Sequence, residues 1–125
     1  MKIILTTLSV SAIILFSTCA FADGDVKKGK VLFNDPKLSG SSFGVSCNKC
    51  HPDGKGLEAS GAAGKTAWRS CSGERKSLED SINTCILTAN KGLPIGLDSQ
   101  EMKDLIAYIK SLAKKTKRKN PKADR

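Results

Sequence analysis

Histidine and aromatic residues are scarce in this chain of 125 residues. It contains one His, one Trp, one Tyr and four Phe, and aromatic residues make up 5% of the sequence. Few large side chains predict a thin hydrophobic core, because a small domain already buries a modest share of its surface. A single imidazole, with only one C-x-x-C pair, also provides too few ligands for a zinc site of four Cys and His side chains.

Long hydrophobic segments are equally rare. The one apolar run, residues 3–16, is shorter than the ~20 residues that a membrane-spanning helix needs. It follows the positively charged start Met1-Lys2 and precedes Ala20-Phe21-Ala22, which has the A-x-A pattern of a cleavage site. We therefore predict a secretory signal peptide at residues 1–22 and a mature chain that is periplasmic or otherwise exported. A retained membrane anchor is the alternative.

Negative charge is nearly absent from the C-terminus. The formal net charge is +9, and residues 114–125 hold seven Lys/Arg against one Asp, whereas residues 23–113 hold thirteen Lys/Arg and eleven Asp/Glu. We predict one domain at 23–113 followed by a basic disordered tail at 114–125. The tail is either a solubilising extension or a surface that attracts an acidic redox partner or an anionic membrane.

The sequence does contain one informative motif, Cys47-Asn48-Lys49-Cys50-His51. C-x-x-C-H is the pattern by which a haem is attached covalently to a polypeptide. Two thiols on one turn can each add to a vinyl group at one edge of the porphyrin, and the histidine that follows then lies under the iron. We predict one haem c, with thioether bonds to Cys47 and Cys50 and with His51 as the proximal iron ligand.

The motif has three competing interpretations. Half of a zinc site would need a second ligand pair, which the sequence lacks. A thioredoxin-like pair would need a preceding strand within a βαβ pattern, and no strand-rich run precedes Cys47. A disulfide between Cys47 and Cys50 is the third. With the only histidine committed to iron, no Ser, His and Asp set supports hydrolysis, and nucleic acid is not expected as a partner of an exported haem protein.

Hydrophobic periodicity predicts helices and loops, with no clear strand. We expect helices over residues 23–34, 77–92 and 99–113, the second ending with Gly92 as its C-cap. The glycine-rich segments between them predict irregular loops. Gly29 costs roughly 1 kcal/mol inside a helix, which suggests that another helix comes close to it. The predicted class is all-α.

Gly29 followed by Leu32-Phe33, the C-x-x-C-H motif and a terminal helix at 104–112 together resemble a small monohaem class I cytochrome c. The resemblance covers about residues 23–113. It implies a cytochrome c-like fold of three to four helices with irregular loops around one covalent haem, its first and last helices crossing at Gly29 and Tyr108. It also implies an electron carrier rather than an enzyme, a monomer or a subunit of a redox complex, that exchanges electrons with partner proteins.

The distal iron ligand differs from the usual pattern of that family, in which a methionine stands in the loop before the last helix. Here the loop carries Leu93, and leucine cannot ligate iron. Met102, in the first turn of the last helix, is one candidate, although it can equally be a core contact. Cys85 is the other, because residues 77–112 are similar to the haem domains of thiosulfate dehydrogenase and sulfur-oxidation cytochromes. In those domains a cysteine in an Ile-Asn-x-Cys context is the distal ligand.

Cys71 provides an alternative use for Cys85. In an oxidising compartment these two cysteines could form a disulfide, which would make Cys85 unavailable as an anionic ligand. The identity of the distal iron ligand affects function, because a thiolate lowers the reduction potential of a haem and Met/His ligation raises it. Three functions remain: a soluble electron carrier, a haem subunit of a sulfur-compound oxidoreductase, and a haem-based binder of small ligands with an open sixth position.

Overall fold

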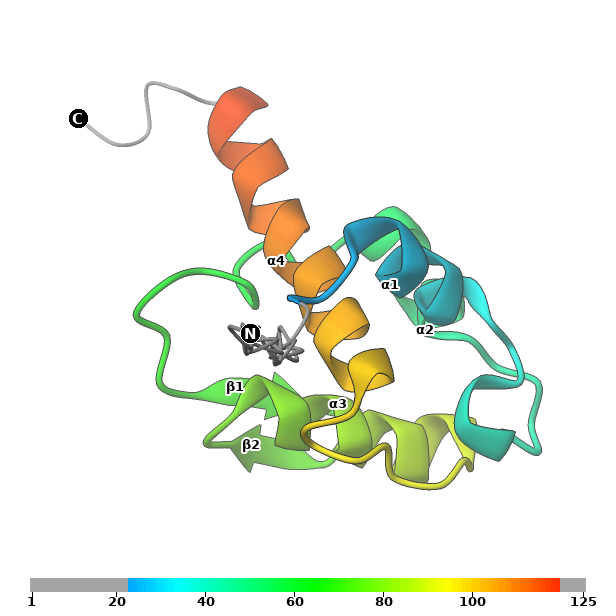
Figure 1. The fold of residues 1–125 in the computed structure, drawn as a ribbon. Helices are drawn as coiled ribbons and strands as arrows, with labels where there is room; N and C mark the ends of the chain where they lie inside the picture. The colour runs from blue at the N-terminus through cyan, green and yellow to red at the C-terminus, as the bar shows by residue number, and fades with distance from the viewer. Residues whose placement is uncertain (1–22, 120–125) are drawn as a thin grey trace, which may run out of the picture.

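The computed structural model describes residues 23–119, so the predicted signal peptide and residues 120–125 lie outside the described residues. Two short strands pack beside a set of helices (Figure 1). The helices are α1 (Val26–Asn34), α2 (Cys47–Cys50), α3 (Leu78–Cys85) and α4 (Gln100–Lys119), with short helical segments η1 (Leu38–Gly40), η2 (Pro52–Gly54) and the π-helical η3 (Ile86–Asn90). The strands are β1 (Trp68–Ser70) and β2 (Gly73–Arg75).

The β1–β2 hairpin corrects the all-α prediction. The strands are antiparallel, with Trp68 opposite Arg75 and Ser70 opposite Gly73. Each strand has three residues, which is too short for an alternating pattern to stand out in the sequence. The fold is therefore mainly helical, and the hairpin lies beside α3, where the hydroxyl of Ser81 donates to the carbonyl of Arg69 at 3.4 Å.

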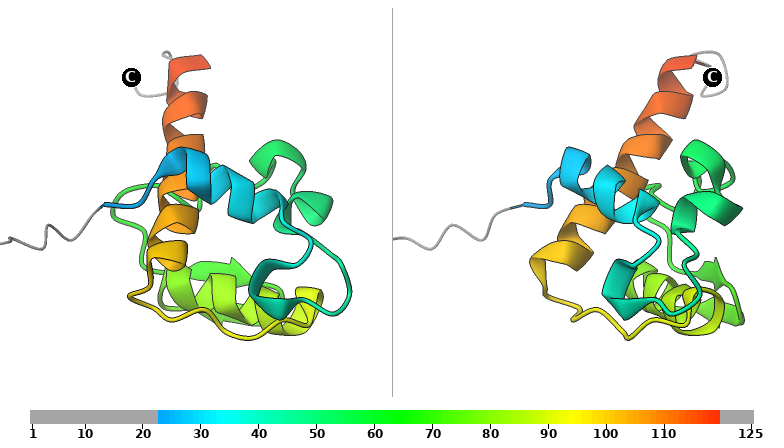
Figure 2. Two further views of the ribbon diagram at one scale, coloured as in Figure 1. Left: turned by 45° about the vertical axis from the view of Figure 1, so that its right-hand side comes forward. Right: turned by 90° about the vertical axis from the view of Figure 1, so that its right-hand side faces the viewer.

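Helices α1 and α4 cross in close contact, as the glycine in α1 predicted. A Cβ atom at Gly29 would overlap the backbone carbonyl of Asp104 and would lie 2.9 Å from Cβ of Tyr108. One turn further along α1, the ring of Phe33 meets the ring of Tyr108, with centroids 5.0 Å apart and planes inclined at 58°. This tilted arrangement is favourable for aromatic pairs. Figure 2 shows the crossing from two directions.

The hydrophobic core is built around this crossing. Met102 is fully buried, and Cys47 and Ile82 pack against the core from its edge. The buried cluster consists of Phe33, Leu38, Ile86, Ile95, Met102, Leu105, Tyr108 and Leu112. Its members from α4 follow the predicted apolar stripe of the last helix. Burial of these side chains is the main stabilising contribution to the fold.

Helix α3 begins as predicted and ends differently. The hydroxyl of Ser77 accepts a hydrogen bond from the Asp80 N–H at 3.1 Å and caps the helix. The helical path continues through η3, and Lys91, with φ +55°, takes the left-handed conformation that we expected at Gly92. Gly92 serves close packing instead, since a Cβ there would lie 3.0 Å from the carbonyl oxygen of Ser39. The predicted C-cap was thus one residue too late.

Helix α4 is longer than predicted. Its start agrees with the sequence, because the hydroxyl of Ser99 accepts from the Met102 N–H at 3.2 Å. Its end lies at Lys119, six residues beyond the expected end at residue 113, and its last turns extend past the rest of the fold (Figure 2). Lys and Arg are good helix formers, and their charge is favourable at a helix C-terminus. The first half of the predicted disordered tail is therefore helical.

Membrane-spanning segments are not found in the part of the chain that the structure describes. No helix between residues 23 and 119 combines the length and the apolar character that crossing a bilayer requires.

Candidate functional site

The Cys47–His51 motif occupies one helical turn. Residues Cys47–Cys50 form α2, and the backbone N–H of His51 donates to the carbonyl of Cys47 at 3.0 Å. Side chains three residues apart on a helix lie on one face, so both thiols share a face of α2. Both cysteines are free, Cys47 half-buried against the core and Cys50 exposed. The structure thus brings the three predicted haem-attachment residues together.

A backbone carbonyl holds the imidazole of His51. Nδ1 of His51 lies 3.1 Å from the carbonyl oxygen of Lys55. A carbonyl oxygen can only accept, so Nδ1 is the donor in this contact, and in the neutral ring that tautomer leaves the lone pair on Nε2. Metal-ligating histidines commonly use this arrangement, since the second hydrogen bond fixes both the tautomer and the ring orientation. The turn itself is fixed locally, because the Asp53 N–H donates to Oδ1 of Asn48 at 2.8 Å.

The Cys47 thiol is unsuited to a thioredoxin-like role. Burial raises its pKa to about 11, with the neighbouring Cys50 adding to the effect and a local backbone N–H opposing it. Reactive redox cysteines depend on a lowered pKa, because the thiolate is the nucleophile. The folded chain therefore keeps Cys47 protonated at neutral pH, which argues against the redox interpretation of the C-x-x-C pair.

The two candidate distal ligands are both engaged elsewhere. Cys85 forms a disulfide with Cys71, with the Cα atoms 5.1 Å apart, and the Cys71 N–H donates to the Cys85 sulfur at 3.2 Å. Cys85 is therefore not a thiolate in this structure and could bind iron only after reduction of that bond. Met102 is 0% exposed within the core cluster, which matches its role as a core contact.

Asn83 of the Ile-Asn-x-Cys segment has a positioning role that the sequence did not predict. Its side-chain amide donates to the carbonyl of Ile95 and accepts from the Ile95 N–H, both at 2.8 Å. This pair fixes the loop that carries Leu93, whose side chain is 71% exposed. The sequence signal for this role is the asparagine of the Ile-Asn-x-Cys segment, between Ile82 and Cys85.

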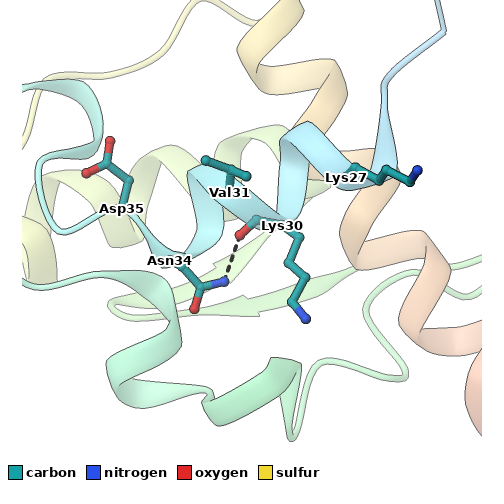
Figure 3. Close-up of a pocket in the computed structure, with 5 residues that line it drawn as sticks. All are labelled: Lys27, Lys30, Val31, Asn34 and Asp35. Carbon is teal, nitrogen blue, oxygen red and sulfur yellow. Dashed lines mark hydrogen bonds between the residues drawn. The ribbon is translucent and has the colours of Figure 1, made fainter.

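A separate pocket lies against α1 and differs chemically from the motif region (Figure 3). Asn34, one of its lining residues, donates to the carbonyl of Lys30 at 2.7 Å, which ties its amide to its own helix. The residues around the pocket are Lys27, Lys30, Val31, Asn34 and Asp35. They provide neither an imidazole nor a sulfur ligand, so this pocket does not supply a second iron ligand to pair with His51.

The donor set fits a haem rather than a directly bound metal ion. Within residues 23–119 no group of three or more His, Cys, Asp or Glu side chains could hold a metal. A porphyrin supplies four nitrogen ligands itself, so the protein needs to provide only axial ligands such as the free Nε2 of His51. Cys47 and Cys50 would hold the porphyrin edge beside it.

Comparison with known proteins agrees with this arrangement. Residues 28–117 match a family model described as SoxA/TsdA, cytochrome c domain. Neither the curated proteins nor the solved structures gave a significant match. The matched region includes the motif, the disulfide and nearly all of α4, so it covers the whole candidate site. The chain therefore belongs to the SoxA/TsdA cytochrome c domain family.

Proposed function

We propose that this protein is an exported c-type cytochrome that carries single electrons on one covalently attached haem. The observation that carries the proposal is the single turn in which Cys47 and Cys50 share a face and His51 presents Nε2. When bound, the haem supplies an iron that cycles between ferrous and ferric states. The chain contributes the attachment, the proximal ligand and a core that shields one side of the site from water.

A redox titration of the purified holoprotein tests the carrier role. We expect one reversible transition in which the ratio of reduced to oxidised protein changes tenfold per about 59 mV, as one-electron transfer requires. Two separate transitions would contradict a single haem. Absence of any haem transition would contradict the proposed function altogether.

A haem subunit of a sulfur-compound oxidoreductase is the second candidate, and the family match favours it. Adding thiosulfate to the ferric holoprotein separates the two. A simple carrier stays ferric when it is alone and is reduced only by a partner enzyme. Reduction of the isolated protein by thiosulfate would support the oxidoreductase role instead.

We further propose an acidic redox protein as the partner. Lys27, Lys28 and Lys30 are exposed on α1, and the basic run of residues 114–119 continues α4. Attraction between such a surface and an acidic partner accelerates association and weakens with salt. Electron-transfer rates with an acidic partner protein should therefore fall as ionic strength rises. Binding to anionic vesicles, with no salt-dependent reaction with such a protein, would favour a membrane surface instead.

A further inference from the structure

Gly54, three residues after His51, is buried against the last helix, α4. Its φ is +80°, and a Cβ atom there would overlap Cδ1 of Leu112 and would lie 2.8 Å from Cδ2. Leu112 is 5% exposed and belongs to the buried core cluster. The backbone of the turn that follows the motif therefore rests on a core side chain of α4, with no room for a side chain between them.

Short backbone contacts connect Gly54 to the imidazole of His51. The Gly54 N–H donates to the carbonyl of His51 at 2.8 Å, and the next residue, Lys55, provides the carbonyl oxygen that lies 3.1 Å from Nδ1 of the ring. A Cβ atom at Gly56 would lie 3.9 Å from the same nitrogen, so this residue also borders the ring. Lys55 is thus held between a glycine that rests on α4 and a glycine beside the imidazole. A shift of Gly54 would therefore move the carbonyl that orients the ring.

The same loop meets α4 a second time at Gly61. A Cβ atom there would lie 2.7 Å from the carbonyl oxygen of Ile109, so the two backbones are in close contact. Trp68 holds the neighbouring residue, because its indole N–H donates to the carbonyl of Ser60 at 2.8 Å. The segment 54–61, which includes the carbonyl acceptor of the imidazole, is therefore attached to α4 at both of its ends.

We infer that Leu112 is a positioning residue for the proximal imidazole. It holds Gly54 on α4, and the backbone of Gly54 and Lys55 then fixes the direction of the ring. The hydrogen bonds of the turn are local and set its shape, whereas the contact with Leu112 sets the place of the turn on the helix. The acceptor of the second N–H of a metal-bound histidine determines both the orientation and the basicity of the ring. This inference rests on the proposed haem-binding function.

Nuclear magnetic resonance of the ferrous, diamagnetic holoprotein can measure how fast the Nδ1 proton of His51 exchanges with solvent. Leu112→Ala leaves a cavity beside Gly54, so the hydrogen bond to Lys55 should open more often and the proton should exchange about three- to tenfold faster. Leu105→Ala is the matched control, because Leu105 is a leucine of the same helix and core cluster, 1% exposed, and lies about two turns from Leu112. Exchange at the wild-type rate in Leu112→Ala, or an equal increase in Leu105→Ala, contradicts the inference. Where an alanine variant fails to fold, Leu112→Val and Leu105→Val make the same comparison with smaller cavities.

The reduction potential gives a second readout, which a loss of stability alone would not change. A weaker hydrogen bond at Nδ1 makes the imidazole a less basic ligand, which favours the ferrous state. At a fixed ambient potential, the ratio of reduced to oxidised protein should rise about two- to fivefold in Leu112→Ala. It should return toward the wild-type value in Leu112→Met, because methionine refills a similar volume beside Gly54. An unchanged ratio in Leu112→Ala overturns the inference. A chain without haem, or a His51 ring whose resonances match those of an unligated imidazole, overturns the proposed function instead.

Discussion

The two sides of the candidate site are built in different ways. The proximal region, residues 47–55, is held by contacts between near neighbours, such as the bond from His51 to the Lys55 carbonyl four residues away. The distal region, residues 81–96, is held by distant segments: Cys85 bonds to a cysteine 14 residues away, and Asn90 to a serine 49 residues away. The proximal region is therefore a local unit, whereas the distal region exists only once the whole domain has folded.

This difference separates two functional tasks. A local turn can present the same two thiols and one imidazole in many domains, and it determines which cofactor is bound. Under the proposed function, the distal region would lie at the second axial position and would supply polar groups near the haem, which adjust the reduction potential of a haem. Changes in the proximal region should accordingly remove the haem attachment or the proximal iron ligand, and changes in the distal region should only modify the site.

Replacement of His51 should have the largest effect. His51→Ala removes the only imidazole but leaves both thiols, so haem should stay attached while the absorption spectrum of the ferric protein changes, because the iron loses its proximal ligand. Added imidazole should restore that spectrum, because it can replace the missing ligand. A spectrum identical to that of the wild type would show that His51 is not an iron ligand.

The Cys71–Cys85 disulfide is the strongest constraint in the distal region. Cys71→Ser and Cys85→Ser should each lower the free energy of unfolding by about 3 kcal/mol, as expected for a closed loop of this length. Denaturant titration of the two holoproteins measures both values. Equal losses are expected, since each variant removes the same bond.

Electron paramagnetic resonance of the same two variants tests the distal ligand. If Cys85 serves only in the disulfide, the ferric spectrum of Cys85→Ser should match that of the wild type. A spectrum changed in Cys85→Ser would instead assign Cys85 as an iron ligand. Met102→Leu completes the series, because it removes the thioether of the other candidate ligand. Titration of free thiols in the denatured holoprotein provides the control: with Cys47 and Cys50 bonded to haem, two reactive thiols in the wild type would contradict the disulfide.

The α1–α4 crossing supports both regions and should respond to a single methyl group. Gly29→Ala places a Cβ against the Asp104 carbonyl, and the resulting shift of the helices should cost about 2–3 kcal/mol. Gly96→Ala is the control, because the nearest atom to its added Cβ would be Cβ of Ser99 at an ordinary 3.6 Å. Thermal unfolding of both holoproteins should show a clear loss only for Gly29→Ala. Equal stability of the two variants would contradict the close crossing.

The two hydrogen bonds between Asn83 and Ile95 should contribute the least of these features to the free energy of unfolding. Asn83→Leu removes two hydrogen bonds to Ile95 and leaves the backbone N–H and C=O of this buried residue without these partners, which should cost about 1–2 kcal/mol. Asn34→Leu is the control, because that amide is exposed and bonds only within its own helix. Hydrogen exchange should show faster exchange at the Ile95 N–H in Asn83→Leu alone. Unchanged protection there would rule out the pair as the anchor of the loop.

The contrast between local and long-range contacts also explains which parts of the fold and of the site the sequence could predict. The motif, the start of α3 at Ser77 and the glycine crossing at Gly29 depend on short-range patterns, and the structure agrees with each of them. The hairpin at residues 68–75 and the left-handed residue Lys91 were missed, because they depend on packing against distant segments. The spacing of Cys71 and Cys85 allowed a disulfide and a ligand equally, and only the folded distances could distinguish them.

Mass spectrometry of the denatured holoprotein, isolated from an exporting host, tests the central claim most directly. The account predicts that the chain carries the added mass of one haem, that the haem resists acidic extraction, and that replacing both Cys47 and Cys50 with Ala removes it. A chain mass without haem, or a haem that extracts freely from the wild type, would contradict covalent attachment at this motif.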